Sequence, residues 1–260
     1  MVEVSNWDYG IRAAQGRYIV GTVNKFGRTI NADSGVATDV HDQADDTATD
    51  VPVWLAPTTA RIHTLVSSSA TDDAASTGLK TVKVSYLADW DTAEASETVT
   101  MDGTDGVAMS NAAVIIHRIK PLTWGTSGVN VGKITATAAS DGTITAQINV
   151  GQGQTQMAVY GVPSIYTLYL ESLYAYFNKA GGNTAAVDIS LLVNPIPGTV
   201  TTKYVVKHTM GLFATGTSGA RHVFSPPKKI DGPAIVKVQA LPGANDLDIS
   251  AGFDGYLVKN

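Results

Sequence analysis

Apolar and polar residues alternate along most of this chain, and clusters of glycine, proline, asparagine and serine separate the alternating segments. Side chains along a β-strand point to opposite faces in turn, so a period of two predicts half-buried antiparallel strands. No window of ordinary helix length shows a clean period of 3.6, and the pattern therefore predicts an all-β protein. Clear examples of the alternation are residues 82–86, 144–150, 187–193 and 204–210.

Turn signals divide the alternating pattern into strands. Asp141-Gly142 lies between two alternating segments, which is typical of a two-residue hairpin turn. Residues 166–177 also fit a helical stripe, but the turn at 181–183 that follows favours a long strand and a hairpin. The predicted strands are residues 59–67, 79–87, 96–102, 112–120, 130–138, 142–150, 156–161, 166–177, 185–193, 201–212, 220–225, 234–241 and 247–258.

Chain length sets the number of domains that we expect. The chain has 260 residues, and an immunoglobulin-sized sandwich takes roughly 100, so the length suits two packed antiparallel β-sandwiches. The pattern predicts one sandwich over residues 58–155 and a second over 156–260, preceded by an extended N-terminal arm over 1–57. Apart from a short strand near 19–23, the arm shows no periodicity, and its acidic residues at 39–50 favour a solvated loop. The alternative is an arm that orders against a neighbouring subunit.

Composition excludes several classes of partner. Charged residues make up 16% of the chain, below the usual ~25%, and a surface so poor in charge favours a protein that is covered by others. The net charge is −5 and the only tight basic pair is Lys228-Lys229, so we expect no nucleic-acid partner. No apolar run approaches the roughly 20 residues of a membrane span, so we expect no membrane partner. The chain has no cysteine, and its first residues do not resemble a secretory signal.

Candidate reaction centres are weak at the level of sequence. Ser218 lacks the spacing of a nucleophile elbow, and no two histidines have the short spacing of a zinc site. Asp102 and Asp105, or the acidic residues at 39–50, lack the spacing of an EF-hand. We therefore expect no catalytic residue, no metal and no cofactor. A glycan-hydrolysing carboxylate pair, which is assembled in space, stays open as the last-ranked hypothesis; its candidates are Glu94, Glu97 and Glu171.

Several segments resemble structural proteins of tailed bacteriophages. They are residues 153–160 followed by Val162-Pro163, residues 222–230, residues 235–240 and residues 248–258, together with 67–70 and 96–101. The resemblance covers roughly residues 59–258. It implies a virion component with jelly-roll-like sandwiches, of the capsid decoration or cement type. Such a protein would be made in the host cytoplasm, bind the major capsid protein at the capsid surface and form a homotrimer.

Two binding hypotheses follow. In the first, a non-enzymatic virion protein stabilises the capsid by bridging its subunits, and aromatic residues of the arm anchor it. The alternative is a head-fibre or tail-associated module that binds host glycans by stacking sugars on Trp90, Trp124 or Tyr256. Self-packing of each aromatic residue onto its own domain is an equal alternative for the anchors. The candidate partner-binding residues of the first hypothesis are Trp7, Tyr9, Tyr18, Phe26 and Trp54.

Overall fold

The described part of the protein consists of β-strands and one short 3-10 helix. No α-helix occurs in it, so the all-β class predicted from the alternation is confirmed. The segment that also fits a helical stripe forms strand β11 (Tyr166–Lys179), and the 3-10 helix is η1 (Asp42–Ala44). The structure is a computed structural model, and it describes residues 20–44, 51–57, 59–179, 184–199 and 203–260.

Eight strands form a jelly roll. Its two sheets have the orders β1-β16-β11-β14 and β10-β15-β12-β13. Counted from one to eight along the chain, these strands pair one with eight, two with seven, three with six and four with five. This is the pairing of one long hairpin rolled into two facing sheets. The strands are β1 (Val20–Ala32), β10 (Val159–Val162), β11, β12 (Thr184–Asn194), β13 (Val205–Thr215), β14 (Thr217–Asp231), β15 (Ala234–Pro242) and β16 (Leu247–Lys259).

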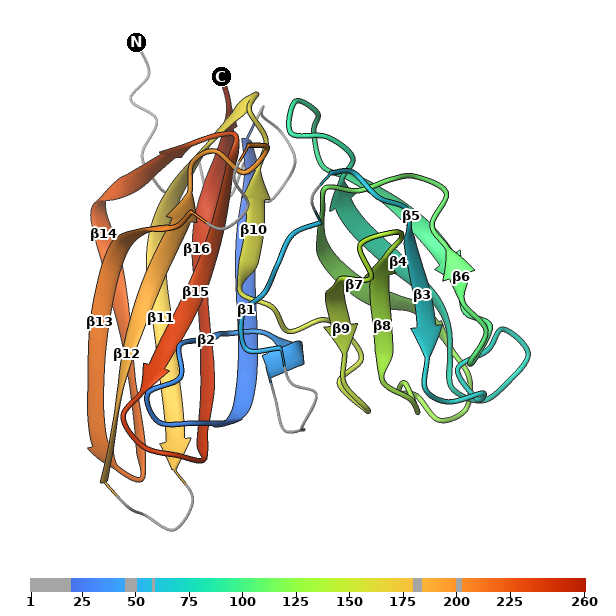
Figure 1. The fold of residues 1–260 in the computed structure, drawn as a ribbon, viewed down its shortest axis with the longest axis horizontal. Helices are drawn as coiled ribbons and strands as arrows, with labels where there is room; N and C mark the ends of the chain where they lie inside the picture. Colours follow the sequence, from blue (N-terminus) through green and yellow to red (C-terminus); the bar gives the residue numbers. More distant parts are fainter. Residues whose placement is uncertain (1–19, 45–50, 58, 180–183, 200–202) are drawn as a thin grey trace, which may run out of the picture.

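A second, smaller sandwich is inserted between β1 and β10. Its sheets have the orders β6-β3-β8-β9 and β5-β4-β7, and it lies beside the jelly roll (Figure 1). We call it the inserted sandwich. Its strands are β3 (His63–Ser67), β4 (Leu79–Leu87), β5 (Ala95–Thr100), β6 (Val107–Ala108), β7 (Ile115–Trp124), β8 (Ile134–Ala138) and β9 (Ile144–Ile148).

Strands of the expected N-terminal arm belong to the jelly roll, and Trp54 and Ala56 pack in the core of the inserted sandwich, which corrects the arm of residues 1–57. All of β1 lies along β16, and the short strand β2 (Thr38–Asp39) pairs with β15. The alternation of β1 is hidden in the sequence because three of its buried positions are Lys25, Gly27 and Thr29 rather than large apolar residues. Residues 20–44 therefore complete the sandwich that was expected to begin at residue 156.

The solvated-loop interpretation of the acidic stretch is wrong for Asp39 and Asp42, which are both buried. Asp39 Oδ2 accepts a hydrogen bond from Lys237 Nζ of β15 at 2.5 Å. Asp42 Oδ2 accepts one from the backbone N–H of Gln156 at 2.7 Å. These two carboxylates fasten the connection between the two sandwiches; the other acidic residues of the stretch, at 45–50, lie outside the described residues.

Each sandwich has its own apolar core, and the two cores meet at a seam. In the jelly roll, the alternation at 187–193 places Val187, Ile189 and Leu191 in the interior, as predicted. At the seam, Val159 of β10 and Ile235 of β15 pack into the core of the inserted sandwich. The contact is close: a Cβ atom added to Gly161 would lie only 2.8 Å from Ile115 Cγ2. The absence of a side chain at Gly161 therefore allows β10 to approach β7.

Candidate interaction surface

The jelly roll has two pairs of sheet edges, and the inserted sandwich covers one pair. β1 and β10 face the inserted sandwich, whereas β13 and β14 end the two sheets on the opposite side (Figure 1). On the covered side, Arg118 Nη2 donates a hydrogen bond to the carbonyl oxygen of Asn24 at 2.7 Å. On the other side, no described strand pairs with the outer edges of β13 and β14. We call this region the β13–β14 surface, and its unpaired backbone groups can accept a strand of another chain.

Large apolar side chains are exposed on the β13–β14 surface. Phe213 is 72% exposed, Val223 61%, Val206 56% and Val205 50%. Phe213 follows the buried Leu212 and Val223 precedes the buried Phe224, so each lies on the outer face of its own sheet, next to the open edge. Edge strands that avoid association carry prolines and several charges, whereas β13 contains no proline and has Lys207 as its one lysine. The surface therefore has the properties of a contact region.

A cluster of rings connects β13 to β14, although no ladder joins these strands. His208 and His222 stack with ring centroids 4.3 Å apart, and the edge of Phe224 meets both rings, at 5.2 and 4.7 Å. Lys228 Nζ lies 5.4 Å from the Phe224 centroid. Partial burial and the neighbouring His222 and Lys228 lower the pKa of His208, so its neutral form is favoured. The cluster stiffens the open side without closing its edges.

Prolines protect one part of β14. Pro226 and Pro227 lack backbone N–H groups, so an added strand finds no donors there. The available edge is consequently β13 together with residues 217–225 of β14.

Two of the residues chosen from sequence as partner anchors are described by the structure, and both lie away from this surface. Trp7, Tyr9 and Tyr18 lie outside the described residues. Phe26 of β1 is half-buried, with the Arg118 guanidinium 5.3 Å from its ring centroid. Trp54 is 1% exposed, and its Nε1 donates a hydrogen bond to the carbonyl oxygen of Thr145 at 2.9 Å. Trp54 and Phe26 therefore pack on their own chain, and no aromatic pattern in the sequence indicates the β13–β14 surface.

The aromatic residues proposed to stack sugars are partly buried. Trp90 and Trp124 pack against the core of the inserted sandwich, and Tyr256 of β16 is half-buried. These three side chains do not form one exposed aromatic platform.

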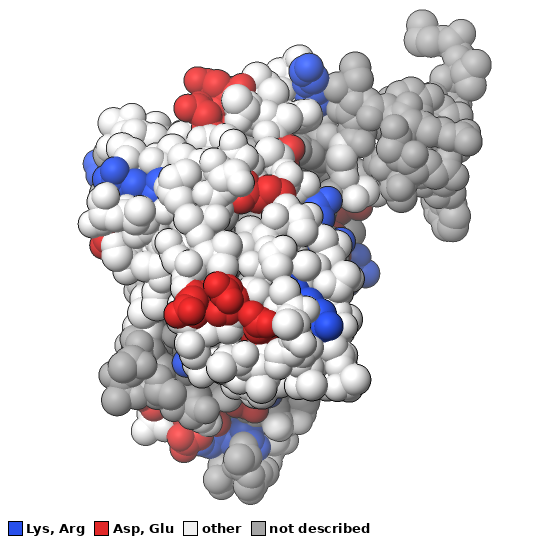
Figure 2. Space-filling model, turned by 90° about the vertical axis from the view of Figure 1, so that its right-hand side faces the viewer, with Lys and Arg blue, Asp and Glu red and all other residues white. Residues whose placement is uncertain are grey.

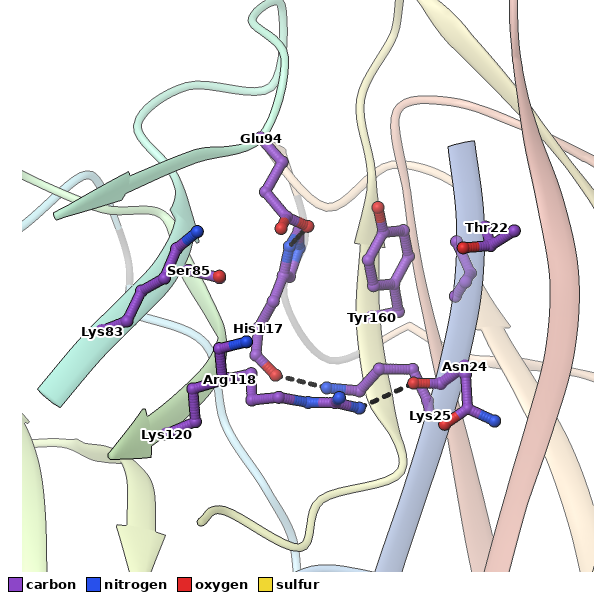
Figure 3. A pocket seen from close by; sticks show the side chains of 11 residues that line it. Thr22, Asn24, Lys25, Lys83, Ser85, Glu94, His117, Arg118, Lys120 and Tyr160 are labelled. Atoms are coloured by element: carbon purple, nitrogen blue, oxygen red, sulfur yellow. Dashed lines mark hydrogen bonds and ion pairs between the residues drawn. The ribbon is translucent and has the colours of Figure 1, made fainter. Parts of the chain in front are cut away.

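A histidine and a glutamate, His117 and Glu94, meet at the seam (Figure 3). The backbone N–H of Gly161 donates to His117 Nε2 at 3.2 Å, so the ring proton is on Nδ1, which donates to Glu94 Oε2 at 2.6 Å. Burial lowers the pKa of His117 despite this carboxylate, and Tyr160 stacks on the ring at 4.2 Å. A general base needs a free lone pair, and the Nε2 lone pair is occupied. In this arrangement His117 orients β7 against β10.

The other candidate glutamates are placed separately. Glu97 of β5 accepts hydrogen bonds from the Ser110 backbone N–H at 2.8 Å and from Asn111 Nδ2 at 2.9 Å. Glu171 lies on β11 of the jelly roll. Glu94 is the one acid among the residues that line the seam cavity, whereas a glycosidase needs two carboxyl groups in one cleft.

Charge is sparse and mixed on the face of the inserted sandwich. Figure 2 shows small separate groups of acidic and basic side chains on a largely uncharged surface. Among the described residues, no group of three or more histidine, aspartate or glutamate side chains is placed to hold a metal ion. In the same ranges, no helix has the length and apolar character needed to cross a membrane.

The fold and surface define a class: a jelly-roll protein with a β-sandwich inserted in its first connection and one open side. No protein-family model matches the chain, and no curated protein sequence matches it. Solved structures that resemble it include T=1 particles derived from infectious bursal virus, with 10% identity, 92% of this chain and 69% of that chain covered, and a TM-score of 0.24. The Gt strain of infectious bursal disease virus gives 9% identity, 92% and 72% coverage, and a TM-score of 0.23. At these values the fold assignment rests on the strand pairing described above.

Proposed function

We propose that this protein is a non-enzymatic structural component of a tailed-bacteriophage virion that decorates the capsid and stabilises it by bridging major capsid protein subunits. The observation that carries the proposal is the asymmetry of the jelly roll. Its β1 and β10 edges are covered by its own insertion, while the β13–β14 surface is open and apolar. A bridging protein needs a stable body and, separate from it, a surface that other chains can cover. The sequence resemblance over residues 59–258 supports the same assignment.

We further propose that three copies associate on the outside of the capsid. An edge on one side of a subunit can contact a different surface of the next copy, and such a head-to-tail contact forms a closed ring when the rotation allows. Weak identical contacts repeated on a symmetric shell add up to firm attachment. The low charge of the chain, 16% of its residues, lowers the desolvation cost of covering its surface.

Co-sedimentation with capsids that lack the protein tests this proposal. Phe213→Asp combined with Val223→Asp places two charges on the β13–β14 surface, and we expect capsid occupancy to fall at least tenfold. Both side chains are mainly exposed, so folding should be retained, as checked by circular dichroism. The matched control is Val150→Asp, because Val150 is also 61% exposed but follows β9 in the inserted sandwich.

The co-sedimentation results test the capsid-decoration role and the use of the β13–β14 surface separately. Failure of the unmodified protein to bind capsids would reject the decoration role. Normal occupancy of the double variant would reject the β13–β14 surface while leaving the role intact. Light scattering that gives the mass of a monomer at the capsid-binding concentration would reject the homotrimer.

A further inference from the structure

A cavity of about 260 Å³ opens at the seam, next to the His117 and Glu94 pair. Its walls come from both sandwiches: β1 contributes one side, and β4 and β7 contribute the other (Figure 3). Hydroxyl groups of Thr22 and Ser85 belong to the lining. The cavity is large enough for a small ligand that touches both sandwiches at once.

Two lysines of the inserted sandwich face this cavity as neighbours. Lys83 of β4 lies directly opposite Lys120 of β7 in the antiparallel register. Like charges at directly opposite positions destabilise a sheet. Within the described ranges, no carboxylate forms an ion pair with either lysine. The two charges therefore lack compensation within the described chain.

Two further cationic side chains add to the positive charge. Arg118 lines the cavity, and Lys25 of β1 is 4% exposed and donates a hydrogen bond to the carbonyl oxygen of His117. Burial, with a smaller contribution from the Arg118 charge, lowers the pKa of Lys25 to about 7. A nearby anion would favour the charged form of this lysine.

The one acid of the lining does not neutralise the lysine pair. Glu94 accepts a hydrogen bond from His117 Nδ1 and another from the Tyr160 side chain. Figure 3 shows its carboxylate beside the His117 ring. Among the described lining residues, four basic side chains outnumber the single acid, which gives the cavity a positive excess.

We propose that this cavity is a binding site for an oxyanion, which contacts Lys83 and Lys120 of the inserted sandwich and the β1 wall of the jelly roll. Phosphate, sulfate and carboxylate share the required chemistry, since each accepts several charge-assisted hydrogen bonds from ammonium and guanidinium groups. Because the ligand spans the seam, its binding stabilises the relative position of the two sandwiches. The inference is independent of the virion role.

Isothermal titration calorimetry with sodium phosphate, sodium sulfate and sodium glutarate, each at constant ionic strength in sodium chloride, tests the site. We expect saturable binding of one anion per chain, weakened at least tenfold by Lys83→Met and by Lys120→Met. Lys80→Met is the matched control, because Lys80 is also half-buried on β4 but lies outside the cavity lining. A preference for phosphate or sulfate indicates an inorganic or phosphorylated ligand, and a preference for glutarate indicates an acidic side chain of a partner.

Thermal unfolding distinguishes a ligand site from a merely repulsive pair. In chloride alone, Lys83→Met should raise the unfolding temperature, because it removes the repulsion. In saturating phosphate or the best-binding anion, the order should reverse, because the unmodified protein gains more stability from the ligand than the variant does. Equal heats for the unmodified protein and both variants, or no anion that binds better than chloride, would overturn the proposal.

Discussion

Replacing Lys237 with methionine tests how the two sandwiches are fastened together. Lys237 Nζ lies 2.5 Å from Asp39 Oδ2, and the two side chains are 2% and 0% exposed. Asp39 also accepts hydrogen bonds from the Trp54 backbone N–H at 2.8 Å and from Gln239 Nε2 at 2.9 Å. Lys237→Met keeps the volume of the side chain but leaves a buried carboxylate with two neutral donors. Removal of one partner of a buried ion pair costs about 3–5 kcal/mol, which we expect near pH 8.

The pH dependence of this loss has a definite sign. Burial raises the pKa of Asp39, and the Lys237 charge opposes that shift, so the variant raises this pKa further. A carboxyl group with a raised folded-state pKa gains protons on folding, so acid favours the folded state between the ordinary value of 3.8 and the raised value. The deficit of the variant relative to the unmodified protein should therefore shrink as the pH falls from 8 to 5, by at most about 1.4 kcal/mol per pH unit.

Urea unfolding followed by tryptophan fluorescence at pH 8 and pH 5 measures both effects. Adding Asp39→Asn to Lys237→Met removes the buried charge and should recover most of the loss. Lys229→Met is the control, because it breaks an ion pair of similar length with Asp231 on the surface, and it should change stability little. A deficit that is the same at both pH values, or a double variant no more stable than Lys237→Met, would refute the reasoning.

Two further predictions concern other buried polar groups. Burial lowers the pKa of His41 to about 3, so the unfolded chain binds more protons than the folded chain between this value and 6.5. Stability should therefore decrease as the pH is lowered through that window, and His41→Asn should flatten the slope of urea stability against pH by about 1 kcal/mol per pH unit. Parallel slopes for the variant and the unmodified protein would contradict the assignment. Asp72 is buried and accepts four hydrogen bonds, from Ser67 Oγ and from the backbone N–H groups of Leu79, Val131 and Gly132. Asp72→Asn turns one acceptor oxygen into a donor that faces two donors, so it should cost about 3 kcal/mol and lower the unfolding temperature; an unchanged temperature would show that these loops do not depend on the carboxylate.

The sequence predicts those strands whose inward positions are apolar, and it fails where they are polar. β12 follows from its alternation because Val187, Ile189 and Leu191 are all buried. β1 is largely hidden because buried Lys25 and Thr29 occupy its inward positions, and their hydrogen-bond partners, the carbonyl oxygens of His117 in β7 and Ala44 in η1, come from other elements. Lys237 of β15 lies on the face opposite Val236 and Val238, which pack in the jelly-roll core, so its burial follows only from the position of Asp39 in the neighbouring strand β2.

The candidate surface depends on topology that composition does not reveal. Aromatic residues attract attention as anchors, yet Trp54 is buried by its own chain. Conversely, Phe213 lies in an ordinary alternating segment and points away from the buried Leu212, and only the position of β13 at the end of a sheet places it next to an open edge. Likewise, the acidic stretch looks solvated until Asp39 is placed beside Lys237, which is 198 positions away in the chain.

The position of the insertion explains why the jelly roll has one covered and one open side. In a rolled hairpin, the first and second strands form neighbouring edges of the two sheets, here β1 and β10. A domain inserted between these strands begins and ends at those edges, so it covers them. β13 and β14 form the opposite edges, and the connection between them is the single residue Gly216, with φ of +89°, which is too short to cover anything. An open side is therefore a consequence of this topology, and the exposed apolar residues on it are what make it suitable for contact with other chains.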